Sequence, residues 1–442
     1  MNRIVYLVIV LFALGSMDIQ AQQDPVEFAI SDYYRLVLNN HPFVRTAELM
    51  SEQGEMVVQE ANGAFDPKLM SNFSSKQFAG KDYFDIWNTY LEVPLFLNMN
   101  MKAGYENNQG EFLNPERTVP EEGQIYFGLS APLGKGLIQN ERSINRKRSV
   151  LVQQNQQNKG QSVLNNLFLD ANHAYWWWYE TYQKRQAILS NLALIQTRFE
   201  GIRTSVINQE SAAIDSVEAY INVQNGLNAL QAAEMELANS ELLLENFIWE
   251  NGLNLDNMSP DSTALLDYSS LNDYLSYAIK NHPKLRTLVA DSSLLLLNQK
   301  LSREQLKPEL NLSYEMLIPG GGLTSEYGSA FSNYKLSAQF AFPVLIRKER
   351  AKLKIAQIKQ EQNQLDINLE SRKILNKIQQ SYNKVLTLER MIRQQEQVVE
   401  NYQTMLRGEE VKFENGESSI FLLNSRANKK LTGEIKPVSY TH

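Results

Sequence analysis

Two long stretches of the chain have the apolar spacing of helices. The first, from about Gln139 to Asn208, contains no proline, and the second, from Arg347 to Arg407, contains neither proline nor glycine. In the second stretch an apolar or aromatic side chain recurs every three or four positions, at Ile374, Ile378, Tyr382, Val385, Leu388 and Ile392. This spacing predicts one apolar stripe along a polar helix, as in a coiled coil. With a rise of about 1.5 Å per residue, each helix would be roughly 100 Å long.

The segments between these stretches alternate between apolar and polar residues. The pattern predicts four strands in the first half and two in the second, near 67–78, 84–93, 97–107, 123–132, 309–318 and 333–343. Such alternation is typical of transmembrane β-barrels, although a half-buried sheet of a soluble protein has the same pattern. The additional hairpin of the first half either extends the wall of strands or packs elsewhere. The glycines at 320–322 lack the Lys and Ser/Thr of a phosphate-binding loop and predict a hairpin tip.

The same order of segments occurs twice along the chain. Asn40-His41-Pro42 matches Asn281-His282-Pro283, and the residues that follow keep one constant offset through Pro67 and Pro308. A match of this length predicts two internal structural repeats. The first spans 27–250, with strands over about 67–132, a long helix over 139–208 and a return helix over 211–250. After a linker at 251–270, the second spans 271–431, with strands over about 309–343, a long helix over 346–414 and a return helix over 418–431.

His41 and His282 are the most obvious candidates for chemistry, but each precedes a proline at equivalent helix junctions. Pro42 and Pro283 suit the first position of a helix, where no N–H is needed. We therefore interpret all four residues as structural. The chain has 4 histidines and none of the usual metal-ligand spacings, so we predict no metal and no cofactor. A nucleophile constellation is also missing from the sequence, and we predict that the protein is not an enzyme.

The N-terminus has the features of a cleaved secretory signal over 1–21. A basic Arg3 precedes an apolar run at 4–14, and small residues lead to Ala21. A membrane anchor is the alternative, but the apolar run is short for a span. No later stretch has 18 apolar residues, so entry into a membrane would require a closed barrel. The net charge of -7 argues against a nucleic-acid partner, and 0 cysteines exclude disulfides and thiolate sites.

The order of these parts resembles the TolC-type outer membrane efflux family. The resemblance rests on the duplicated Asn-His-Pro junctions, on Asp66-Pro67 and Lys307-Pro308 before the strands, and on the paired long helices and their turns. It covers about residues 27–431 and implies an α+β membrane protein that forms a homotrimer. Trimerisation would complete a transmembrane antiparallel β-barrel, and long antiparallel coiled-coil helices would form an α-barrel. The family implies a passive conduit in the outer membrane of a Gram-negative bacterium, extending into the periplasm.

The resemblance also implies partners and a site for them. The family docks on a periplasmic adaptor (membrane fusion) protein and an inner-membrane transporter, with outer membrane lipid around the barrel. Adaptor contact is implied at the two helix-to-helix turns, at Asn208, Gln209, Glu210, Ser211, Asp215, Asn415, Gly416, Glu417 and Ser418. Family members often close this end with acidic residues just after the second turn. Here that stretch reads Phe421-Leu422-Leu423-Asn424, so no gate of that kind is predicted.

The C-terminal stretch departs from the family pattern. Gly433 and Pro437 predict that the last helix ends near residue 431, which leaves a truncated return helix and an atypical tail over 432–442. The three adjacent tryptophans at 176–178 point in different directions on a helix, which favours packing over ligand stacking. The leading interpretation is an outer membrane channel of a tripartite export system. The alternative is an envelope-associated structural coiled-coil protein without channel activity.

Overall fold

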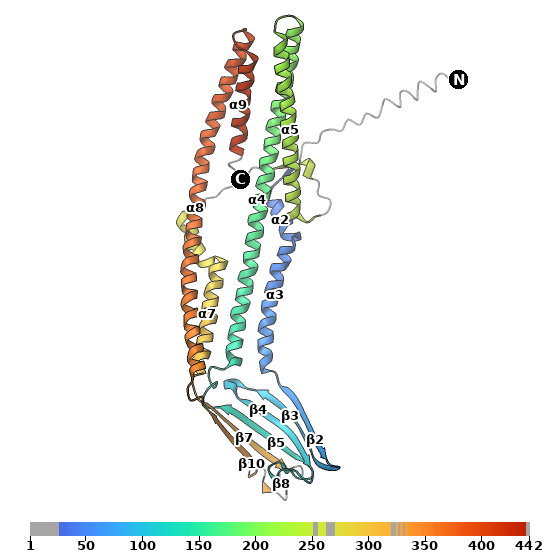
Figure 1. The fold of residues 1–442 in the computed structure, drawn as a ribbon, viewed down its shortest axis with the longest axis vertical. Coiled ribbons are helices and arrows are strands. Elements are labelled where there is room, and N and C mark those ends of the chain that lie inside the picture. The colour runs from blue at the N-terminus through green and yellow to red at the C-terminus, as the bar shows by residue number, and fades with distance from the viewer. Residues whose placement is uncertain are drawn as a thin grey trace, which may run out of the picture. The chain divides into compact units, whose positions relative to one another are not determined.

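The computed structural model describes residues 26–250, 255–261, 270–319, 324–325, 328–329 and 332–438. The predicted signal peptide over 1–21 and the predicted hairpin tip at 320–322 lie outside these residues. Two helices, a group of strands, one long helix and a shorter helix follow one another, and the same order then occurs again (Figure 1). None of the described helices combines the length and the apolarity needed to cross a membrane.

The chain divides into two compact units. The helical unit comprises the described residues within Met1–His41, Leu167–Asp267 and Val385–His442, and the sheet unit comprises those within Pro42–Asn166 and Tyr268–Lys384. The long helices contribute residues to both units: α4 (Glu141–Ile207) has 67 residues and α8 (Arg347–Glu414) has 68. The sequence predicts these two helices over 139–208 and 346–414.

In the helical unit, α5 (Ala213–Ile248) and α9 (Ile420–Val438) return from the ends of α4 and α8 (Figure 1). The unit also contains α2 (Ile30–Asn40), η4 (Leu255–Asn257) and a parallel pair of short strands, β1 (Val26–Phe28) and β6 (Met258–Pro260). The sequence analysis predicts neither strand, since β1 lies at the start of the first repeat and β6 lies in the linker over 251–270. Their backbone groups bond to a segment far away in sequence, which local patterns do not reveal.

The last helix, α9, corrects a prediction, because it continues through Gly433 and Pro437. Pro437 has no N–H to donate to the carbonyl of Gly433, four residues earlier. The Gln395 side chain on α8 donates its Nε2–H to that carbonyl instead, at 3.2 Å. A Cβ at position 433 would lie 3.1 Å from Cδ2 of Tyr402, so the glycine allows close packing of α9 on α8. Tertiary contacts thus keep both residues within the helix.

An aromatic core holds α2, α4 and the short strands of the helical unit together. Tyr33, Tyr175 and Trp178 have no exposed surface. The ring of Phe28 lies 6.1 Å from that of Trp178, and the Tyr175 hydroxyl donates to the Phe28 carbonyl at 2.7 Å. The Tyr33 hydroxyl donates to the Ala171 carbonyl at 3.1 Å. Trp178 therefore packs in the core, the role that the sequence favours for the tryptophan run.

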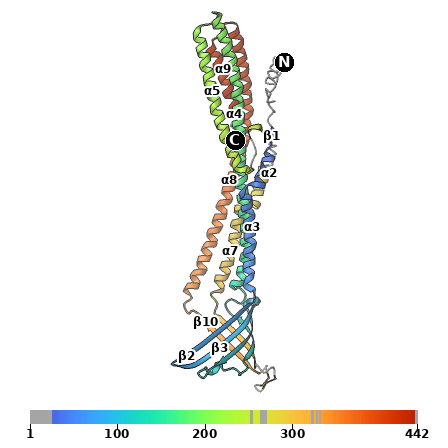
Figure 2. The ribbon, with the colours of Figure 1, turned by 90° about the vertical axis from the view of Figure 1, so that its right-hand side faces the viewer.

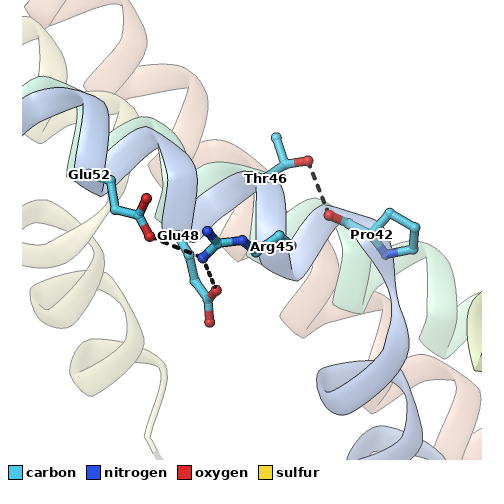
Figure 3. A network of polar contacts seen from close by, with 5 residues as sticks. All are labelled: Pro42, Arg45, Thr46, Glu48 and Glu52. Carbon is cyan, nitrogen blue, oxygen red and sulfur yellow. Dashed lines mark hydrogen bonds and ion pairs between the residues drawn. The ribbon is translucent and has the colours of Figure 1, made fainter.

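In the sheet unit, the helices are α3 (Pro42–Asn62), α6 (Leu271–Asn281) and α7 (Pro283–Glu304). The first turn of α3 is closed by Thr46, whose hydroxyl donates to the Pro42 carbonyl at 3.1 Å (Figure 3). Arg45 donates to Glu48 at 2.9 Å and to Glu52 at 3.0 Å (Figure 3). Exposed pairs of this kind contribute little to stability. Apolar packing contributes more, as where Ala278, Leu285 and Ile374 join α6, α7 and α8.

Six antiparallel strands form the sheet of this unit, in the order β10-β7-β5-β4-β3-β2. Their bounds are β2 Lys68–Phe78, β3 Lys81–Pro94, β4 Asn100–Gln109, β5 Gln124–Pro132, β7 Glu309–Pro319 and β10 Tyr334–Ala341. Short 3-10 helices lie at Gly63–Phe65, Phe96–Asn98 and Pro115–Arg117, and β8 (Thr324–Ser325) pairs with β9 (Gly328–Ser329) separately. The sheet is curled across its width (Figure 2). The inserted hairpin of the first half, β3–β4, lies between β2 and β5.

Candidate functional site

The register of the six strands separates their side chains into two chemically distinct faces. Leu69 pairs with Leu91, Leu91 with Ala103, Ala103 with Phe127, Phe127 with Met316, and Met316 with Tyr334. This row belongs to the apolar face, whose other members include Phe73, Trp87, Val93, Met101, Ile125, Leu129, Leu310, Leu312, Tyr314, Ile318, Leu336 and Phe340. The face is continuous from one edge of the sheet to the other.

Much of the apolar face has no covering layer. Leu69 is 76% exposed, Phe127 48% and Phe340 68%. Apolar patches of this extent mark contact with a protein partner or with lipid. The exposed apolar face therefore indicates that the sheet contacts lipid or another protein.

The opposite, polar face carries one row that crosses all six strands and is charged on every strand except β5, which contributes a glycine. Lys68, Glu92, Lys102, Gly128, Glu315 and Lys335 lie opposite one another in register. Lys102 Nζ lies 3.9 Å from Glu92 Oε2, and Lys335 Nζ lies 3.8 Å from Glu315 Oε2. On one side of this row lie Asn100, Ser130, Ser313 and Ser337. On its other side lies a row of larger side chains, with Met70, Tyr90, Tyr126 and Leu317, and beyond that a polar row with Asn72, Asn88, Glu106 and Gln124. This face is suited to water.

The turn after α4 is closed by a Schellman motif, the pair of backbone bonds that ends many helices. The Gln209 N–H donates to the Val206 carbonyl at 3.1 Å. The Glu210 N–H donates to the Ser205 carbonyl at 2.9 Å. Gln209 has a left-handed backbone with φ of 65°, a conformation in which a side chain is unfavourable.

The turn after α8 has the same motif with a glycine at the left-handed position. The Gly416 N–H donates to the Phe413 carbonyl at 3.0 Å, and the Glu417 N–H donates to the Lys412 carbonyl at 2.8 Å. Gly416 has φ of 75° and no atom near the place of a Cβ. The two turns therefore differ chiefly in the residue at this position.

Exchanging the residues at these positions is expected to change stability in opposite directions. Gln209→Gly should stabilise its turn by up to about 1 kcal/mol, and Gly416→Gln should destabilise its turn by about 1–2 kcal/mol. The loss at position 416 would come from the left-handed backbone and not from a steric clash, because no atom lies near the place of a Cβ there. Amide hydrogen exchange at the turns would measure both effects, and changes of the same sign would contradict this explanation.

Side chains around the second turn hold a carboxylate. The Ser418 hydroxyl donates to Glu409 Oε1 at 2.5 Å, and Arg426 Nε lies 3.5 Å from Glu409 Oε2. The bond from Ser418 lowers the pKa of Glu409, and Arg426 adds to this effect. The ionised carboxylate thus joins the end of α8 to the turn and to α9.

Acid is expected to loosen the second turn. Because the folded-state pKa of Glu409 lies below its ordinary value, its contribution is complete above the ordinary pKa and is lost as pH falls through the folded pKa. Ser418→Ala should raise the pH at which protection from hydrogen exchange is lost, after correction for intrinsic rates. Ser211→Ala, at the equivalent position of the first turn, is the control and should leave that pH unchanged. An unchanged value for Ser418→Ala would contradict the assignment.

An apolar cluster joins the helices that flank the two turns. Its buried members are Ile202, Ala219, Leu406, Ile420, Leu423 and Ala427. Arg198 on α4 donates to Glu410 on α8 at 2.7 Å. The helices that flank the two turns therefore pack together, and the nine predicted turn residues lie at one end of this packed group. Asp215 lies in the first turn of α5.

The His-Pro junctions differ in their surroundings. His41 ends α2, and its ring stacks on Phe247 with centroids 5.9 Å apart. His282 caps α7, where its Nδ1 accepts the Lys284 N–H at 3.3 Å. Burial lowers the pKa of both histidines, so neither is primed to carry a proton at neutral pH. Pro42 and Pro283 occupy the first positions of α3 and α7.

Sequence reasoning missed a groove between α5, α8 and α9. It has a volume of about 720 Å³ and is lined by residues that include Glu218, Asn222, Tyr402, Phe421, Asn428 and Lys429. These residues are far apart in sequence, and no local pattern indicates that the two helical hairpins pack together. The groove begins close to the turns and offers both charged and aromatic groups.

Comparison with known proteins agrees with these features. Residues 274–425 match the sequence model of the family described as outer membrane efflux protein. The chain resembles the outer membrane efflux family. The match covers about a third of the chain and runs from α6 into α9. None of the curated protein sequences matches the chain significantly.

Solved outer membrane proteins share the fold of this chain over most of its length. VceC from Vibrio cholerae, an outer membrane protein, has a TM-score of 0.67 at 11% identity, over 93% of this chain and 92% of VceC. The outer membrane channel CmeC from Campylobacter jejuni has a TM-score of 0.63 at 10% identity, over 93% of this chain and 82% of CmeC. The MtrE outer membrane channel from Neisseria gonorrhoeae, solved in its open state, has a TM-score of 0.60 at 14% identity, over 92% and 84%. The likeness is one of fold.

Proposed function

We propose that the protein is the outer membrane channel of a tripartite export system and acts as a passive conduit. The observation that carries this proposal is the sheet, which has one continuous apolar face, one polar face and, in the described part of the chain, two edge strands that are paired on one side alone. The apolar face suits lipid chains, and the polar face suits a water-filled interior. Lipid tolerates no open sheet edge, so the sheet must be completed by other strands before it can lie in a membrane.

Three copies of the chain, each adding its sheet, would close the barrel. The two helical halves, which we interpret as structural repeats, would likewise combine into an α-barrel in the periplasm. In this arrangement the outer membrane of a Gram-negative bacterium holds the sheets. The family resemblance and the fold shared with solved channels support both parts of the proposal.

A periplasmic adaptor would dock where the two turns and the groove lie close together. The groove presents Glu218 and Lys429 beside the rings of Tyr402 and Phe421, a mixture suited to a polar helical partner. An inner-membrane transporter would deliver the substrate through that adaptor. The conduit itself would need no catalytic residue, and among the described residues no cluster of three or more His, Cys, Asp or Glu could hold a metal.

Membrane fractionation tests this proposal against a structural coiled-coil protein with a soluble sheet. The conduit should stay in the outer membrane fraction after a carbonate wash and should migrate differently on gels before and after heating. Liposomes that contain the purified protein should admit small sugars. A protein that the carbonate wash releases would contradict the proposal.

A further inference from the structure

The two halves of the chain contribute unequal numbers of strands to the sheet, although equivalent prolines mark the start and the end of the strands in each half. In each half a proline precedes the first strand, Pro67 before β2 and Pro308 before β7. In each half a proline also marks the end of the last strand: Pro132 is the last residue of β5, and Pro343 follows β10 by two positions. By position β2 corresponds to β7 and β5 to β10. The hairpin β3–β4 has no counterpart in the described residues of the second half, where β8 and β9 pair only with each other.

The additional hairpin is a full part of the sheet. β3 pairs with β2 from Lys68 and Glu92 to Phe78 and Lys81, and β4 pairs with both β3 and β5. A hairpin that folded over the sheet as a lid would not share this register. β3 and β4 therefore add width to the wall itself.

The hairpin also continues the chemistry of both faces. On the apolar face it adds Trp87, 53% exposed, and Leu91, 41% exposed. On the polar face it adds Glu92 and Lys102, which form an ion pair with each other. The hairpin thus extends both the apolar face, which suits lipid, and the polar face, where its two charges are paired.

The edges of the sheet can be completed by a second copy of this chain. Among the described residues, β2 and β10 each have a partner strand on one side alone. Because the six strands alternate in direction, β2 and β10 run antiparallel to each other. Their apolar residues lie on the same face, with Leu69 and Phe73 on β2 and Leu336 and Phe340 on β10. The β2 edge of one copy therefore fits the β10 edge of the next.

We propose that the β3–β4 hairpin widens the membrane barrel to eighteen strands, six from each of three copies. Two equal halves with two strands each would give twelve strands instead. Barrel diameter grows roughly linearly with strand number, so the barrel would be about one and a half times as wide. A barrel of this size encloses an aqueous channel without further rearrangement. This inference rests on the proposed trimeric conduit.

The test is the number of strands in the barrel of detergent-extracted protein, counted by cryo-electron microscopy in cross-section. The wild-type protein should show eighteen strands. A deletion of Lys81–Gln109 should show twelve, with a diameter smaller by about a third. Because two strands are removed, β2 and β5 would still pair in antiparallel directions, with their apolar residues on the same face. The residues at 110–123 would then connect the two strands.

The possible outcomes separate this inference from the proposed function. A wild-type ring of twelve strands, with the hairpin outside the wall, would overturn the inference and leave the conduit standing. The absence of any closed ring would overturn the proposed function as well. The wild-type count decides the question even if the deletion variant does not fold.

Discussion

Leu129→Arg is expected to destabilise the folded protein in lipid by about 2–4 kcal/mol. Leu129 lies on the apolar face of β5, a strand in the interior of the sheet, and is 43% exposed. An arginine there would place its charge among lipid chains, and the cost is greatest near the middle of the bilayer. The expected result follows only if the apolar face meets lipid.

The neighbouring residue provides a matched control. Ser130 lies on the polar face of the same strand, level with Asn100 and Ser313. Ser130→Arg should change stability by less than about 1 kcal/mol, because the added charge would face water. Both values would come from urea titrations of the protein in lipid vesicles, followed by the heat-dependent shift on gels. Equal losses for the two variants would contradict the assignment of the faces.

Trp178→Ala is expected to destabilise the helical unit by about 3–5 kcal/mol. The Trp178 side chain has no exposed surface and packs with its ring 6.1 Å from Phe28 and 5.8 Å from Tyr175. Its removal would leave a cavity where α4 meets β1. Thermal unfolding of the detergent-extracted protein, followed by circular dichroism, would measure the loss.

Trp177→Ala is the control for this variant. Trp177 is the adjacent tryptophan on α4 but is only half-buried, so its loss should cost about 1 kcal/mol. The comparison separates the packing of one position from the presence of a tryptophan run. A smaller loss for Trp178→Ala than for Trp177→Ala would contradict the core described for this unit.

Local patterns in the sequence were sufficient for most elements of the fold. The long helices followed from uninterrupted apolar spacing, and α4 and α8 extend over nearly the predicted residues. The pattern of apolar and polar residues predicted four strands in the first half and two in the second, and these six form the sheet. In both cases each element carries its own signal within a few residues.

The features that sequence analysis missed depend on residues far apart in the chain. β1 pairs with β6, more than two hundred positions later. The helix α9 passes Gly433 and Pro437 because Gln395 and Tyr402 on another helix compensate. The groove between α5, α8 and α9 likewise depends on the packing of two separate hairpins. Patterns of neighbouring residues in a single sequence do not reveal contacts between distant segments.

The mass of the detergent-extracted protein tests the central claim most directly. The protein would be extracted from outer membranes in a mild detergent and measured by light scattering after size exclusion, with the detergent contribution subtracted. A trimeric conduit predicts three times the mass of one mature chain. A single-chain mass would leave β2 and β10 without partners in the membrane, and it would contradict the conduit.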